Sequence, residues 1–276
     1  MKNLTFFTEK ENLEAIIKNH LPNKKIININ KISTGWTNIV IDVGTTNEDY
    51  IFRFPRNDFF SQVMEKDVIA NNFLKQTINL KTVDMQICYD SSRPFSMHKK
   101  ITGTPLTNKL STLTTQEIDK ITTEIAEFFY KIHSININSI PQECKNTLSN
   151  FLINLAQIDD NEYDYSGLLE LEADEKNNLV FVHGDLNIGN ILLDNNNNIC
   201  AFIDFAFTGL SDIYCDLSRI SCRVNEEFLY KILQKYELIS NTKININKIK
   251  SRNKMWKYVE EQYLIYAKNN LPEIEI

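Results

Sequence analysis

The first hundred residues alternate apolar and polar positions in short runs that are separated by turn residues. Alternation with a period of two predicts strands, because successive side chains of a strand point to opposite faces. In the run Tyr50–Phe54 this pattern places Arg53 on the face opposite Phe52 and Phe54. Strands are predicted in this region over residues 26–32, 39–43, 50–54, 85–89 and 95–100.

Helical patterns surround and follow these strands. Thr8–Glu11 is typical of a capping box ahead of a helix that ends near His20, and another helix is expected over residues 60–76. Beyond the last predicted strand helices predominate, beginning with a second capping box, Thr114–Glu117, before a long helix to about His133. A strand-rich first third and a mainly helical remainder predict an α+β protein.

One stretch of the helical part carries three polar residues at a spacing that is typical of kinases. In His183-Gly-Asp-Leu-Asn-Ile-Gly-Asn190, Asp185 and Asn190 form an Asp-x-x-x-x-Asn pattern, and Asp204 follows fourteen residues later. This is the spacing of the kinase catalytic loop and its magnesium-binding aspartate. Short apolar runs predict strands at residues 179–182, 191–193 and 199–203. These strands would place Asn190 and Asp204 at one end of a hairpin.

The three residue types suit phosphoryl transfer from a nucleotide. Asp185 would accept the hydrogen bond, and then the proton, of an attacking hydroxyl group. Asn190 and Asp204 would bind magnesium, a hard cation that prefers oxygen ligands. The alternative is that all three are ordinary turn residues, since Asp and Asn are enriched in turns. The His-Gly before the loop and the Ile-Asp-Phe after it, each next to a predicted strand, favour the catalytic interpretation.

This pair of motifs resembles that of the aminoglycoside phosphotransferase and choline kinase superfamily. The His-Gly-Asp of residues 183–185 and the Ile-Asp-Phe of residues 203–205 match the family, and Gly209–Leu217 is similar to its Gly-Asp-Pro-x-x-Asp-Leu stretch, with Ile213 in place of proline. The resemblance implies an α+β, two-lobed, protein-kinase-like fold. A small antiparallel-sheet N-lobe would bind the nucleotide, and a larger, mainly helical C-lobe would hold the catalytic and substrate sites; the expected bounds are residues 1–100 and 101–276.

The resemblance also implies where the nucleotide binds. Ser33, Thr34 and Gly35 occupy the place of the phosphate-covering loop, although a single glycine between two strands would also suit a hairpin turn. Backbone groups of Lys99 and Ile101, in the predicted hinge between the lobes, would meet the nucleotide base. The co-substrate is expected to be ATP or GTP, and the hinge residues do not distinguish the two.

Arg53 lies in a Phe-Arg-Phe-Pro sequence, where protein kinases carry the strand lysine that contacts the α- and β-phosphates. Arginine remains charged and can bind phosphate through two nitrogens, so the role survives the change of residue type. The expected carboxylate partner is on the following helix, and Glu65, which has the longer side chain, is preferred to Asp67. The alternative is an exposed strand arginine without a role.

The acceptor site is predicted from family analogy alone. Acidic residues after the metal-binding aspartate and on the last helices would gather the amines of a cationic substrate. In this chain they would be Glu226, Glu227, Glu260 and Glu261. The aromatic residues near the last pair would equally suit a hydrophobic core.

The expected activity is magnesium-dependent transfer of the γ-phosphoryl group to a hydroxyl of a small molecule, foremost an aminoglycoside antibiotic. Three alternatives stay open. The first is a kinase of the same fold for choline, homoserine, methylthioribose or a macrolide. The second is a protein kinase, which the lack of an Ala-Pro-Glu segment after Asp204 disfavours. The third is a catalytically silent nucleotide-binding module.

Composition narrows the class of protein without deciding it. The net charge of −6 argues against a nucleic-acid partner, because binding to phosphate backbones needs a basic face. No apolar run is long enough to span a membrane, and the N-terminus lacks the pattern of a signal peptide. The five cysteines are scattered and do not form Cys-x-x-Cys pairs. We therefore expect a cytoplasmic enzyme with reduced cysteines, and we expect it to be a monomer.

Overall fold

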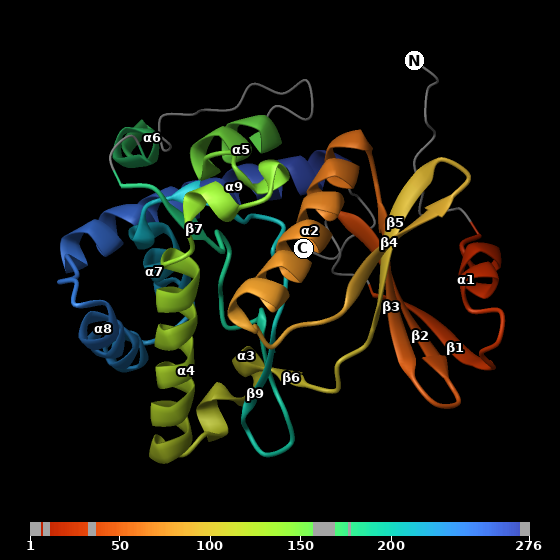
Figure 1. Cartoon of the computed structure of the whole chain (residues 1–276), viewed down its shortest axis with the longest axis horizontal. Coiled ribbons are helices and arrows are strands. Elements are labelled where there is room, and N and C mark those ends of the chain that lie inside the picture. Colours follow the sequence, from red (N-terminus) through yellow and green to blue (C-terminus); the bar gives the residue numbers. More distant parts are fainter. Residues whose placement is uncertain (1–6, 8–11, 33–36, 157–168, 176–177, 271–276) are drawn as a thin grey trace. The chain divides into compact units, whose positions relative to one another are not determined.

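The computed structural model describes residues 7, 12–32, 37–156, 169–175 and 178–270 (Figure 1). The chain divides into two compact units. The first comprises Met1–Val68, Val83–Ile101 and Leu264–Ile276, and the second comprises Ile69–Thr82 and Thr102–Tyr263. Each unit has a hydrophobic core of its own.

An antiparallel five-stranded sheet forms the centre of the first unit, in the order β1-β2-β3-β5-β4. Every strand lies within about two residues of the range that the alternating sequence pattern predicted. The strands are β1 (Ile26–Ile32), β2 (Asn38–Thr45), β3 (Asp49–Pro55), β4 (Met85–Asp90) and β5 (Arg93–Lys99).

One face of this sheet is packed with aromatic side chains. Phe52 and Phe54 of β3 are fully buried, and their rings stack on Phe95 of β5 with centroid distances of 6.1 and 5.0 Å. Helix α1 (Glu14–His20) adds Ile17 to the same cluster. Arg53 lies on the opposite face of β3, as the period-two alternation predicted.

Two predicted helix starts have different outcomes. Thr8–Glu11, the first expected capping box, lies outside the described residues, and α1 is described only from Glu14. Helix α4 (Thr115–His133) begins at the second expected capping box: the Thr114 hydroxyl accepts from the Glu117 backbone, and the Glu117 carboxylate accepts from the Thr114 backbone. This prediction is confirmed. Helix α2 (Asp58–Ile78) extends two residues beyond its predicted range at each end.

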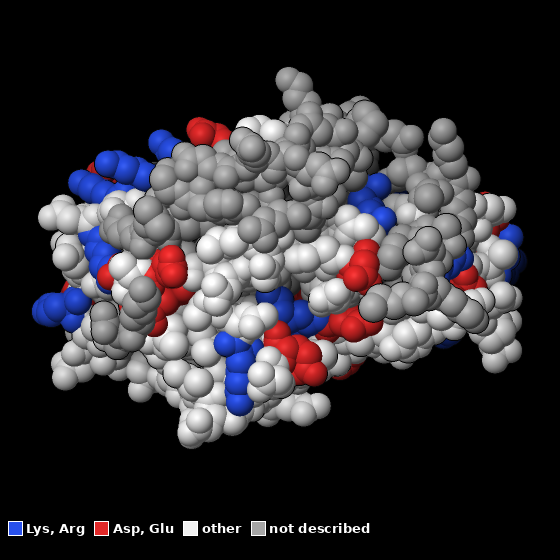
Figure 2. All heavy atoms as spheres, turned by 90° about the horizontal axis from the view of Figure 1, so that it is seen from above, with Lys and Arg blue, Asp and Glu red and all other residues white. Residues whose placement is uncertain are grey.

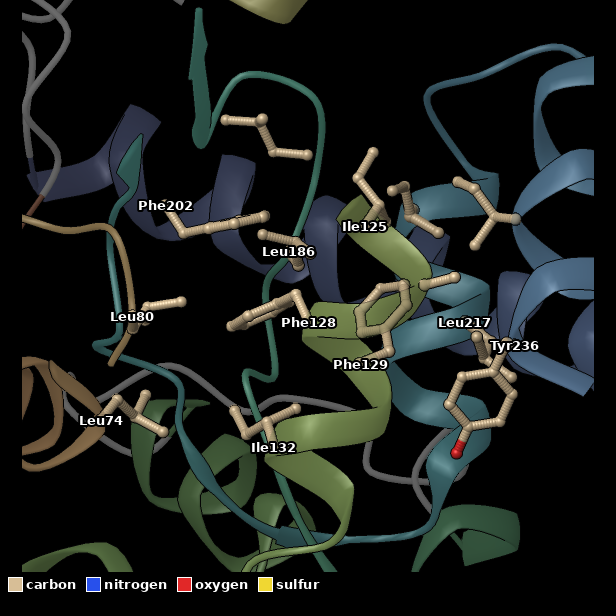
Figure 3. Packing of buried hydrophobic residues seen from close by; sticks show 14 of the residues in the cluster. Leu74, Leu80, Ile125, Phe128, Phe129, Ile132, Leu186, Phe202, Leu217 and Tyr236 are labelled. Carbon is tan, nitrogen blue, oxygen red and sulfur yellow. The ribbon is translucent and has the colours of Figure 1, made fainter. Parts of the chain in front are cut away.

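The second unit is mainly helical. Helix α4 packs against α8 (Glu226–Ser240) and buries Ile125, Phe128, Phe129 and Ile132 (Figure 3). Short strands form two small sheets, of which one pairs β7 with β10 and the other orders β6-β8-β9. The strands are β6 (Thr104–Pro105), β7 (Val180–Val182), β8 (Ile191–Leu193), β9 (Ile199–Phe202) and β10 (Gly209–Ser211). The remaining helices are α3 (Leu106–Lys109), α5 (Leu148–Ala156), α6 (Leu169–Glu175), α7 (Ile213–Ser221), α8 (Glu226–Ser240) and α9 (Ile246–Asn270). Short 3-10 turns lie at Leu110–Thr112, Ile137–Ser139 and Gln142–Cys144.

Figure 2 shows acidic and basic side chains intermixed on one face of the molecule, which agrees with the small net charge of −6. Among the helices of the described residues, none is both long enough and apolar enough to cross a membrane. All five cysteines are free thiols.

Candidate active site

The predicted catalytic loop, residues 183–190, connects β7 to β8 and is anchored by two apolar side chains. Leu186 is fully buried and Ile188 is 5% exposed, while Asp185 before them and Asn190 after them are partly exposed. Leu186 belongs to the same buried cluster as Phe128 of α4 (Figure 3). Burial of a leucine side chain stabilises by about 1.5–3 kcal/mol, enough to fix the loop against the core while its polar residues face outward.

The start of the loop is held by a buried carboxylate. Asp216 of α7 accepts hydrogen bonds from the backbone N–H groups of His183, at 2.9 Å, and Gly184, at 2.8 Å. Gly184 has a φ of +79°, and a Cβ atom there would lie 2.3 Å from the Phe207 carbonyl oxygen. Only glycine fits this conformation and this space, which explains the glycine of the His-Gly-Asp motif.

Asp216 is itself held by a histidine and a tyrosine. The His133 ring contacts the Asp216 carboxylate at 3.1 Å through Nε2 and the Tyr236 hydroxyl at 2.9 Å through Nδ1. Burial alone would raise the pKa of Asp216, but the hydrogen bond from His133 and the nearby histidines keep that pKa below its ordinary value. An ionised Asp216 is the form that accepts both backbone N–H groups.

His183 has a structural position. Its Nδ1 accepts from the Asp185 backbone N–H at 3.3 Å, which leaves Nε2 to donate to the Ile203 carbonyl, also at 3.3 Å. The ring is fully buried. The His183 ring thus connects the catalytic loop to the segment that ends at Asp204, which is a structural role.

Asn190 and Asp204 lie at one end of the β8–β9 hairpin. Ile191 pairs with Phe202, and the Ile203 N–H donates to the Asn190 carbonyl at 3.0 Å, so the two expected ligands flank the last rung of the ladder. The Asn190 side-chain amide donates to the Asp185 carbonyl at 3.0 Å, which turns its Oδ1 away from the loop backbone. Asp204 has a φ of +68°, a conformation that aspartate tolerates better than most residues.

This pair fits magnesium. An oriented amide oxygen and a carboxylate are hard ligands, and magnesium is commonly bound by one or two protein side chains together with substrate phosphates. The positive φ of Asp204 is the kind of unusual backbone conformation that clusters at functional sites. Bound there, the ion would neutralise charge on the nucleotide phosphates.

The Asp185 carboxylate has an ion-pair partner that the sequence interpretation did not identify. Arg219 of α7 donates from Nε to Oδ1 of Asp185 at 2.5 Å, and its Nη1 donates to Glu260 of α9 at 2.5 Å. The Arg219 side chain is only 10% exposed. The sequence signal was weak: Arg219 lies between Leu217 and Ile220, and a charged residue that is buried usually has a partner.

Arg53 pairs with Asp67, and the prediction of Glu65 as its partner is wrong. Nη1 of Arg53 contacts Oδ2 of Asp67, whose side chain is fully buried. Burial and the charge of Asp58 raise the pKa of Glu65, the opposite of what an arginine partner would do. Residues two apart on a helix point about 200° apart, so only one of the two carboxylates can face β3.

Asp67 and Glu65, two carboxylates on the same helix, should contribute unequally to stability. Asp67→Asn should lower the free energy of unfolding by about 3 kcal/mol, because it removes a fully buried carboxylate that pairs with a mostly buried guanidinium. Glu65→Gln should change that free energy by less than about 0.5 kcal/mol. Urea unfolding of both variants, followed by circular dichroism, measures the difference. Equal effects of the two substitutions would contradict the assignment.

The other expected nucleotide-binding residues are located only in part. Ser33, Thr34 and Gly35 lie outside the described residues. Lys99 ends β5; its ammonium group pairs with Glu48 and its side chain is 65% exposed. The side chain of Ile101 packs against a small cluster that contains Val83. The contact of Lys99 and Ile101 with a nucleotide base stays a prediction.

The four acidic residues expected at the acceptor site have unlike environments. Glu226 and Glu227 are exposed on the first turn of α8, and Glu261 is exposed on α9. Glu260 is different, because it accepts from Arg219 and, at 2.7 Å, from Nη2 of Arg223. Burial would raise the pKa of Glu260, but the two arginines hold that pKa below its ordinary value. Its carboxylate is therefore already neutralised within the protein.

Comparison with known proteins identifies the class of enzyme. A model of the phosphotransferase enzyme family matches residues 28–237 of the chain, a range that contains both motifs and the whole loop described above. The chain belongs to the phosphotransferase enzyme family. This membership confirms the resemblance to the aminoglycoside phosphotransferase and choline kinase superfamily, and it makes the protein a small-molecule phosphotransferase with a hydroxyl acceptor.

Solved structures of this phosphotransferase family have the same kinase-like fold, which confirms the predicted fold class. A complex of APH(2")-IIia with GDP and kanamycin is 17% identical, with a TM-score of 0.72 over 95% of each chain. Macrolide 2'-phosphotransferase type I is 15% identical, with a TM-score of 0.68 over 98% of this chain and 96% of that one. Choline kinase LicA from Streptococcus pneumoniae is 16% identical, with a TM-score of 0.70 over 95% and 92%.

Proposed function

We propose that this phosphotransferase moves the γ-phosphoryl group of ATP or GTP to a hydroxyl of an aminoglycoside, with magnesium as its cofactor. The observation that supports this most strongly is the arrangement of Asp185, Asn190 and Asp204 around one hairpin end, with the carboxylate and the amide each oriented by hydrogen bonds. The division into a nucleotide lobe of residues 1–100 and a catalytic lobe of residues 101–276 is part of this proposal.

Asp185 has one carboxylate oxygen for the chemistry. Oδ1 accepts from Arg219, and among the described residues Oδ2 has no hydrogen-bond donor. The acceptor hydroxyl would donate to Oδ2 while its oxygen forms the bond to the γ-phosphorus and the bond to the β–γ bridging oxygen breaks. The proton of the hydroxyl then passes to Asp185. Because the transition state is loose, positioning and charge neutralisation supply most of the rate.

The nucleotide would be bound by the residues that the family resemblance assigns to it. Asn190 and Asp204 would hold magnesium, whose contribution when bound is to neutralise phosphate charge. Arg53, fixed in place by Asp67, would contact the phosphates. The segment Ser33–Gly35 would cover the phosphates, and the backbone at Lys99 and Ile101 would meet the base.

The acceptor is proposed to be cationic, with Glu226, Glu227, Glu260 and Glu261 as the candidate carboxylates. The structure of one neighbour contains kanamycin, which supports aminoglycosides as the first acceptors to test. An amine that uses Glu260 must compete with Arg223, whose side chain is 51% exposed and therefore displaceable at small cost.

A coupled turnover assay tests the proposal. MgATP and MgGTP are each supplied with kanamycin, streptomycin, a macrolide, choline, homoserine and methylthioribose. Turnover stimulated by the aminoglycosides is the expected result. Stimulation by choline or a macrolide instead would replace the acceptor class while leaving the reaction type intact. If no acceptor stimulates turnover and neither nucleotide shifts the thermal unfolding midpoint, the nucleotide-dependent activity itself is refuted.

A further inference from the structure

Arg219 forms an ion pair with the proposed catalytic carboxylate of Asp185, and it lies on a different element. It lies on α7, thirty-four residues after Asp185, and it contacts Oδ1 alone. Burial would lower the pKa of Arg219, but the charges of Asp185 and Glu260 raise it, so the guanidinium remains charged. A charge-assisted hydrogen bond of this kind restricts the carboxylate to one orientation.

Arg219 is fixed by contacts on several sides. Nη1 donates to Glu260, and the guanidinium carbon lies 5.1 Å from the centroid of the Trp256 ring. Trp256 is itself buried at 1% exposure, and its Nε1 donates to the Ser218 hydroxyl at 3.0 Å. The Arg219 side chain therefore has little conformational freedom. A side chain must be fixed in this way if it is to position another one.

The helix that carries Arg219 is also the helix that holds the catalytic loop. Asp216 and Arg219 are three residues apart on α7 and so lie on neighbouring positions of one helix face. Asp216 binds the backbone at His183 and Gly184, and Arg219 binds the side chain of Asp185. One face of α7 thus fixes both the main chain and the reactive side chain of the loop.

We propose that Arg219 is a positioning residue for phosphoryl transfer, an inference that rests on the function proposed above. It holds Oδ1 of Asp185 so that Oδ2 faces the acceptor hydroxyl, and Glu260 and Trp256 hold Arg219 in turn. Arginine suits this role better than lysine, because its planar fork binds two carboxylates at once in fixed directions. Glu260 accordingly belongs to the catalytic support as well as to the candidate acceptor site.

The test compares the turnover of Arg219→Ala and Arg219→Lys with that of the wild type, with MgGTP and kanamycin as substrates. If kanamycin is not an acceptor, the hydrolysis of MgGTP is measured in its place. We expect Arg219→Ala to lower kcat by about tenfold to a hundredfold, since misplacing a reacting group by one ångström can cost that much. The KM for the nucleotide should stay within twofold. Arg219→Lys should be intermediate.

Chemical rescue separates positioning from simple folding support. Guanidinium chloride, at a concentration that does not unfold the protein, should raise the turnover of Arg219→Ala severalfold, while sodium chloride at the same ionic strength should not. Arg93→Ala, which removes an ion-paired arginine outside this site, is the matched control and should show no rescue. Each variant is also checked by thermal unfolding.

Two results would overturn the inference. Arg219→Ala could keep turnover within twofold of the wild type, or it could lose turnover in proportion to lost folded protein with no response to guanidinium. A wild type that forms no GDP from MgGTP and no ADP from MgATP, with or without acceptor, refutes the proposed function, and the inference falls with it. The two failures are distinguishable because the second is visible before any variant is made.

Discussion

Asp185→Asn is expected to lower the rate of phosphoryl transfer by a factor of about 10² to 10⁴, the usual contribution of a general base. The amide has the shape of the carboxylate, but it cannot take the proton of the acceptor hydroxyl. Nucleotide affinity should change by less than about threefold, because Asp185 is not among the residues proposed to bind the phosphates or magnesium. Steady-state turnover and calorimetric titration with nucleotide measure the two quantities.

A matched control for this variant is Asp119→Asn on α4. Asp119 is also a carboxylate in an ion pair, with Lys235, but its side chain is 62% exposed and lies outside the catalytic loop. We expect it to keep wild-type turnover. Near-normal turnover of the Asp185→Asn protein would exclude Asp185 as the base, whatever its effect on stability.

Asp204→Asn is expected to cost at least about a hundredfold in kcat, since magnesium contributes several kcal/mol of charge stabilisation and each 1.4 kcal/mol is a factor of ten. Asparagine tolerates the positive φ at this position, so the substitution removes charge without forcing a new backbone conformation. The variant should also need more magnesium for half-maximal activity. Removing magnesium from the wild type with a chelator should have the same effect on kcat.

A measurement without turnover gives an independent reading of the metal site. In the wild type, magnesium should raise the thermal unfolding midpoint in the presence of nucleotide, and in the Asp204→Asn protein this increase should be smaller. Asp194→Asn at the other end of the same hairpin is the control, because Asp194 accepts from the backbone of Asn196 and Asn198 in a tight turn. An unchanged magnesium response in Asp204→Asn would show that Asp204 is not a ligand.

Features that depend on neighbouring residues were predictable from the sequence. The strand containing Arg53 shows its two faces through alternation, and the Thr114–Glu117 capping box forms as its residue types require. The hairpin that ends at Asn190 and Asp204 follows from two short apolar runs and the polar turn between them. These interactions are decided within a few residues of chain, where steric and hydrogen-bonding preferences are strong.

The choice between Glu65 and Asp67 was different, because both stand on one helix and either could reach a strand arginine. Which of the two faces β3 depends on the rotation of α2 about its own axis, and that rotation is set by the packing of its apolar side chains. The preference for the longer side chain was therefore the wrong criterion. The buried Asp67 shows that the helix presents its other side.

The sequence by itself determined the class of this protein: the spacing of Asp185, Asn190 and Asp204 predicted a phosphotransferase, and family membership confirms that class. Only the tertiary structure decided what surrounds those residues. Arg219 and Glu260 are far from Asp185 along the chain, and they meet because α7 and α9 pack together through Trp256. Long-range contacts of this kind depend on how whole helices pack, which no local pattern of residues encodes.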